Sequence, residues 1–67
     1  MDVAKLRDEM YRKRMSVDGL CEITGIDRSR MYRRLKGEGH KMTLEEAKGI
    51  AKALSLTNEK AIEIFLA

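Results

Sequence analysis

Apolar residues recur every three or four positions through most of the chain, the spacing of helices that bury one face. This spacing predicts five short helices joined by turns, over residues 2–14, 16–25, 27–36, 43–54 and 58–66. No proline interrupts the pattern. The sequence therefore predicts an all-α fold, a compact bundle of five short helices, with residues 1–67 forming a single domain.

Each expected helix begins with a residue whose side chain can accept a hydrogen bond from the first helical turn. These capping residues are Asp2, Ser16, Asp27, Thr43 and Thr57. Residues 43–46 form a complete capping box, and Gly25 and Gly37 are placed to end the second and third helices. Gly19 lies in mid-helix, where glycine costs about 1 kcal/mol relative to alanine; close packing against a neighbouring helix is one explanation.

The positions that share a helical face define the expected core. They are Val3, Leu6, Met10, Leu20, Cys21, Met31, Leu35, Leu44, Ala47, Ile50, Ala51, Leu54, Ala61, Ile64 and Phe65. Either Ile23 or Thr24 supports the second helix. A chain of 67 residues buries only a small core, which argues against an enzyme with a deep cleft, a dinucleotide-binding fold or a barrel.

The sparse cysteine and histidine content limits the possible chemistry. One cysteine, Cys21, and one histidine, His40, can form neither an internal disulfide nor a zinc site. No apolar stretch has the length of a membrane span or a signal peptide. We therefore expect a cytoplasmic protein without metal or cofactor. Cys21 is interpreted as a small core residue and His40 as a solvated loop residue.

Positive charge is concentrated near the middle of the chain. The formal net charge is +3, yet residues 27–41 alone carry six basic side chains against two acidic ones. Four of the six are arginines, which suit forked contacts with phosphate and guanine. A solvated helix face is the alternative interpretation of such a run.

A helical wheel separates these cations from the core. With about 100° per residue, Met31 and Leu35 lie together and define the buried side of the third helix. Ser29, Arg33 and Lys36 lie opposite, with Tyr32 beside them. Arg30 and Arg34 share one flank, and Arg28 projects from the first turn. One such helix fits the width of a DNA major groove.

The second and third helices, with the glycine turn between them, resemble a known family. Residues 20–37 (LCEITGIDRSRMYRRLKG) are similar to the helix-turn-helix of the phage-repressor and Cro-type (lambda repressor-like) proteins. Residues 43–47 (TLEEA) and the final Ile64-Phe65 resemble the two helices that follow in that family. Val17 stands where the family often has a phosphate-binding glutamine, and Cys21 where it usually has alanine. The resemblance implies a protein of a bacterial cell or phage-infected host.

The resemblance and the wheel together assign roles to the basic segment. Base contacts are expected from Arg28, Ser29, Tyr32 and Arg33. Phosphate contacts are expected from Ser16, Arg30, Arg34, Lys36 and Lys41. For Tyr32, the alternative is an exposed ring that covers an arginine side chain, and each phosphate candidate could instead be merely solvated. The adjacent Glu45 and Glu46 are explained by the capping box and receive no acid–base role.

The last helix carries more apolar surface than one small core requires. Ile62 and Leu66 share a face that differs from the core face, and this second face is expected to form a twofold dimer. The alternatives are fraying of the helix end or additional coverage of the core. A dimer would read two half-sites about 34–36 Å apart. The sequence therefore predicts a sequence-specific transcriptional regulator that binds double-stranded DNA, with no small-molecule ligand. The alternative is a protein-binding module on the same fold, such as an anti-repressor or an antitoxin-like partner.

Overall fold

A computed structural model describes all 67 residues and contains helices but no strands. The helices are α1 (Val3–Arg12), α2 (Val17–Thr24), α3 (Arg28–Lys36), α4 (Leu44–Ala53) and α5 (Asn58–Phe65), with a short 3₁₀ turn, η1 (Gly39–Lys41), before α4. The all-α fold and the five helices predicted from the sequence are confirmed. None of these helices combines the length and the apolar character needed to cross a membrane.

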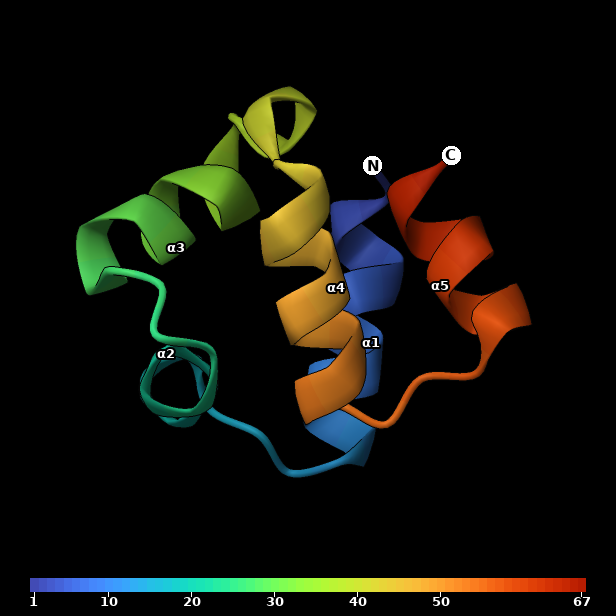
Figure 1. Ribbon diagram of the computed structural model, residues 1–67, viewed down its shortest axis with the longest axis horizontal. Coiled ribbons are helices and arrows are strands. Elements are labelled where there is room, and N and C mark those ends of the chain that lie inside the picture. The colour runs from blue at the N-terminus through green and yellow to red at the C-terminus, as the bar shows by residue number, and fades with distance from the viewer.

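The helices are arranged with α4 at the centre of the molecule (Figure 1). Helices α2 and α3 lie at one end of the longest axis, and α5 lies at the other. Helix α2 packs against α3 and α4, and α1 packs against α5. The two ends of the chain meet, since the Asp2 backbone N–H donates to the Ile64 carbonyl at 2.7 Å. The helix-turn-helix unit therefore projects from the opposite end to both termini.

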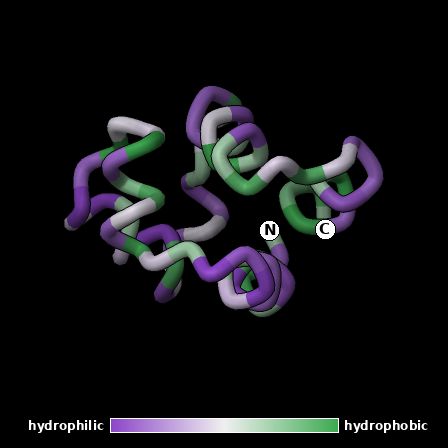
Figure 2. The backbone as a smooth tube through the Cα atoms, turned by 90° about the horizontal axis from the view of Figure 1, so that it is seen from below, coloured by the Kyte–Doolittle hydropathy of each residue, from purple (hydrophilic) through white to green (hydrophobic).

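One cluster of eight buried side chains forms the core, and every helix contributes to it. The cluster consists of Leu6, Met10, Leu20, Met31, Leu35, Ile50, Leu54 and Ile64. All eight are among the positions predicted from the helical spacing. Hydrophobic and hydrophilic segments alternate along the helices (Figure 2), as amphipathic packing around one core requires.

All five predicted N-caps are confirmed, because each capping side chain accepts a backbone N–H from the first turn of its helix. The Thr43 box is complete: the hydroxyl accepts from the Glu46 N–H, and the Glu46 carboxylate accepts from the Thr43 N–H. Gly25 ends α2 with a φ of 76°, a left-handed conformation that favours glycine. The turn into α3 is therefore determined locally by the sequence.

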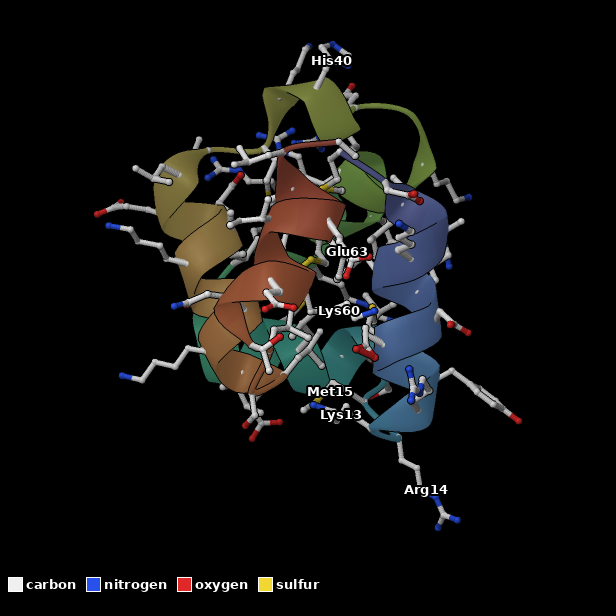
Figure 3. All side chains as sticks on the ribbon, turned by 90° about the vertical axis from the view of Figure 1, so that its right-hand side faces the viewer. Lys13, Arg14, Met15, His40, Lys60 and Glu63 are labelled. Carbon is white, nitrogen blue, oxygen red and sulfur yellow. The ribbon has the colours of Figure 1, made fainter.

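Helix α1 is shorter than the sequence predicted. It ends at Arg12 instead of Arg14, and Arg14 has a left-handed φ of 53°. The Lys13 ammonium donates to the Leu54 carbonyl at the end of α4. In Figure 3, Arg14 and His40 lie at opposite ends of the molecule, and the Arg14 side chain points outward. A long-range contact to α4 thus accompanies the early end of α1.

The structure decides three packing positions that the sequence left open or placed differently. A Cβ at Gly19 would approach Ser16 Oγ at 3.2 Å and Met15 Sδ at 3.3 Å, so Gly19 is crowded by the residues just before its own helix, not by a neighbouring helix. Thr24 supports α2, its hydroxyl donating to the Leu20 carbonyl, whereas Ile23 is exposed. Leu44, expected in the core, is 71% exposed.

Candidate nucleic-acid interface

Two buried side chains attach helix α3 to the core, and a cap at Asp27 stabilises the first turn of the helix. Met31 and Leu35 are buried, as the wheel predicted. The Asp27 carboxylate accepts hydrogen bonds from the backbone N–H groups of Ser29 and Arg30, at 3.0 and 3.4 Å. Burial of one narrow side leaves the rest of the helix open to solvent. The helix therefore lies on the surface of the bundle with its long donors directed outward.

The outward face of α3 contains the residues expected to contact bases. Arg28, Ser29, Tyr32 and Arg33 are all exposed, and Lys36 continues the face into the last turn. Arg33 keeps 54% of its side-chain surface, and its Nε lies 3.6 Å from the Glu38 carboxylate. A surface ion pair of this length is worth little, so it does not hold Arg33 away from a ligand.

Arg28 forms the shortest ion pair of these donors. Its Nε lies 3.0 Å from Asp18 Oδ1, an acidic group in the first turn of α2. Its guanidinium carbon lies 5.9 Å from the centre of the Tyr32 ring, at the limit of a cation–π contact. The Tyr32 ring therefore lies near the Arg28 guanidinium, and the base contact expected from Tyr32 stays a prediction. Nothing in the sequence pattern identified Asp18.

Arg34 departs from the role expected of it. Only 12% of its side chain is exposed, and its guanidinium contacts Glu46 and Glu38 at 3.3 Å each. On the wheel, Arg34 lies closer to the buried side of α3 than Arg30 does, which brings it against α4. Both carboxylates compete with any phosphate for its donors. We therefore reassign Arg34 from a phosphate contact to a residue that joins α3 to α4.

The other phosphate candidates remain on the surface. Lys36 and Lys41 are exposed and form no salt bridge. Arg30 is half exposed, with Nη1 3.6 Å from Glu46 Oε2. Ser16 is exposed, and its hydroxyl accepts from the Gly19 N–H as the cap of α2. Ser16 can still donate its own hydroxyl proton to a phosphate oxygen.

Glu46 is the centre of the contacts that hold α3. It is buried, accepts a hydrogen bond from the Thr43 N–H and another from Arg34 Nε, and its Oε2 has no hydrogen-bond partner. Burial tends to raise the pKa of this carboxyl, but the Thr43 N–H and Arg34 outweigh burial, so the pKa lies below its ordinary value. The sequence explained Glu46 as a cap, and its second role depends on tertiary proximity.

This lowered pKa predicts an acid-dependent loss of stability. The Glu46 contribution is complete above about pH 4.5, the unfolded-state value, and is lost as the pH falls through the lower folded-state pKa. As the pH falls below about 4.5, the wild type should therefore lose more stability than a Glu46→Gln variant, which has no carboxyl group to titrate at this position. Thermal unfolding at a series of pH values measures the difference, and parallel curves would contradict it.

The two residues considered for chemistry show no reactive arrangement. Burial, with a smaller effect from Asp18, raises the pKa of the Cys21 thiol, which disfavours the nucleophilic thiolate. His40 lies in η1 at the surface, pointing away from the helices (Figure 3). No group of three or more His, Cys, Asp or Glu side chains is placed to hold a metal ion.

A second surface lies between α4 and α5. A groove of about 300 Å³ contains mostly apolar side chains. It is lined by Leu44, Ala47, Lys48, Ala51, Asn58, Ala61, Ile62, Phe65 and Leu66. Ile62 is 56% exposed and Leu66 is 77% exposed, so the second apolar face expected on the last helix is open. Leu44 is a third exposed apolar residue at this groove, and the sequence interpretation had placed it in the core.

The capped turn at Gly25, the buried attachment of α3 and its exposed basic face define a helix-turn-helix DNA-binding domain. Comparison with protein families identifies the same class. Residues 5–64 match the Cro/C1-type HTH DNA-binding domain, which covers nearly the whole chain, and the protein belongs to this family. Searches of curated proteins and of solved structures gave no significant match.

Proposed function

We propose that this protein regulates transcription by placing α3 in the major groove of a specific operator and binding there as a homodimer. The observation that carries the proposal is the exposed face of α3, where Ser29, Arg33 and Lys36 are free of the core. In this family the fold binds DNA. The side chains on this face are the donors that read base edges and phosphates. Occupancy of the operator would block polymerase or a competing regulator.

Two sets of side chains would make two kinds of contact with DNA, one with base edges and one with phosphates. Arg28, Ser29, Tyr32 and Arg33 face the groove from the first two turns of α3 and would contact base edges. Phosphates on either side would bind the flanking donors, which are Ser16, Arg30, Lys36 and Lys41. Arg34 is left out of this set because its guanidinium already binds two carboxylates. Each phosphate that is neutralised adds about 0.9 to the slope of log affinity against log salt.

The groove between α4 and α5 fits a second copy of the same chain. Ile62 and Leu66 form exposed apolar projections, and alanines 47, 51 and 61 leave room beside them. A twofold axis would place the projections of each copy against the groove of the other. Helix α5 lies at the opposite end of the longest axis, 27 Å in extent, from α3 (Figure 1). Two copies could therefore span half-sites about 34–36 Å apart.

Selection from a random pool of DNA duplexes at physiological salt tests the proposal. A palindromic consensus with two half-sites one helical turn apart is the expected result. Equal affinity for random and selected duplexes would leave a nonspecific binder. A salt-insensitive complex with a protein, with no affinity for DNA, would overturn the proposal in favour of a protein-binding module.

Two substitutions on α3 separate base reading from phosphate binding. Arg33→Ala should relax the preference at one base position of each half-site, at a cost of about 1–3 kcal/mol in discrimination. Lys36→Ala should weaken binding to all sequences alike and lower the salt slope by about 1. Repeating the selection with each variant measures both effects. A consensus identical to that of the wild type would refute the base contact of Arg33.

A further inference from the structure

Asp18, an acidic residue of α2, lies against Arg28, the first residue of α3. Asp18 Oδ1 is 3.0 Å from Arg28 Nε, and both side chains are about two-thirds exposed, at 64% and 67%. Two such exposed groups contribute little to folding stability. Yet the pair joins the first turns of the two helices that form the helix-turn-helix unit. We therefore expect the pair to affect the binding of DNA more than the stability of the fold.

The Asp18 carboxylate contacts the inner part of the Arg28 guanidinium and leaves the outer part free. The carboxylate lies closest to Nε, the inner nitrogen of the guanidinium. The two terminal nitrogens are the part that forms a forked contact with O6 and N7 of guanine. The Tyr32 ring, 5.9 Å from the guanidinium carbon, gives a second contact to the same group. Both groups thus contact the inner part of the Arg28 side chain, while 67% of that side chain stays exposed.

We infer that Asp18 is a positioning residue, which orients Arg28 for a forked contact with one guanine in each half-site. This inference rests on the proposed function and extends it to a residue outside α3. An arginine side chain loses rotamer freedom when it is fixed in one geometry. Because Asp18 restricts Arg28 before DNA arrives, less of that freedom remains to be lost on binding.

The charge of Asp18 gives the inference a distinctive signature. A carboxylate close to the DNA-facing turn repels phosphates, so its removal should strengthen binding to random duplexes. The same removal should reduce the preference for one base pair, because Arg28 becomes free to rotate. A change that raises nonspecific affinity and lowers selectivity at one position is not the result expected from a residue that only stabilises the fold.

The test compares Asp18→Asn with Glu22→Gln in selection from a random duplex pool. Glu22 lies one turn further along α2, is exposed, and forms no salt bridge with Arg28. Asp18→Asn should lower the preference for guanine at one position by about fivefold or more and raise the affinity for random DNA. Glu22→Gln removes the same charge and should leave the base preferences unchanged. Circular dichroism verifies that both variants are folded.

A third variant shows whether Asp18 acts through Arg28. Arg28→Lys, which cannot form the planar fork, should lose the same preference, and adding Asp18→Asn to it should change that position no further. A wild-type consensus that Asp18→Asn leaves intact would overturn the role of Asp18 while the proposed function stands. A sharper preference in Asp18→Asn would also overturn it, since Asp18 would then compete with DNA for Arg28. A wild type without any consensus would overturn the proposed function itself.

Discussion

Replacing Ile62 and Leu66 together by aspartate should convert the proposed dimer into a monomer and lower the affinity for a palindromic duplex by about 100-fold or more. Both side chains are mostly exposed in the single chain, so the substitutions leave the core intact. In a dimer each would be buried, and a buried carboxylate without a partner is strongly unfavourable. Sedimentation gives the mass, and titration with one-site and two-site duplexes gives the loss of joint binding.

The control for this variant places the same two charges on another surface. Ala4 and Tyr11 are exposed on α1, away from the groove between α4 and α5. The variant with Ala4→Asp and Tyr11→Asp should keep the mass and most of the operator affinity of the wild type. Helicity by circular dichroism should be unchanged in both variants. An unchanged mass for the variant at residues 62 and 66 would rule out this groove as the dimer interface.

Replacing Glu46 by alanine should destabilise the fold by about 3 kcal/mol, near the lower end of the range for breaking a buried ion pair. The substitution leaves Arg34 largely buried with only Glu38 beside it and removes half of the capping box. For a domain of this size the loss corresponds to a fall of about 20 °C in Tm. Thermal unfolding at neutral pH measures it directly.

The neighbouring glutamate provides a matched control. Glu45 is exposed in the same first turn of α4 and forms no salt bridge. Glu45→Ala should therefore change the free energy of unfolding by no more than about 0.5 kcal/mol. The double variant Arg34→Met with Glu46→Leu should lose less than Glu46→Ala, because no buried arginine is left without its main partner. Equal Tm values for Glu45→Ala and Glu46→Ala would contradict the role given to Glu46.

Helix positions were predictable because their determinants are local. A cap such as Asp27 accepts hydrogen bonds from the N–H groups two and three positions further on. Gly25 adopts a left-handed conformation that is unfavourable for residues with a side chain. The buried side of α3 also follows from helical periodicity, since Met31 and Leu35 lie together on any helix. The exposed basic face opposite them follows from the same geometry.

The roles of individual charges were less predictable. Arg30 and Arg34 share one flank of α3 on a wheel and both contact Glu46, yet Arg34 is only 12% exposed whereas Arg30 is 53% exposed. Its partner Glu46 lies twelve positions further along the chain, on a different helix, so no local spacing connects it with Arg34. The contact between Asp18 and Arg28 is also not local, because the turn between α2 and α3 brings the two residues together.

The sequence by itself determined the five helices, their starts, the core face of each and the concentration of cations on the third, because each depends on neighbours within one or two turns. Only the tertiary structure decided which cations remain free, which carboxylates hold α3, and that Leu44 joins Ile62 and Leu66 at an open groove. These outcomes depend on the angles and distances at which whole helices pack, and those are set by the core as a unit.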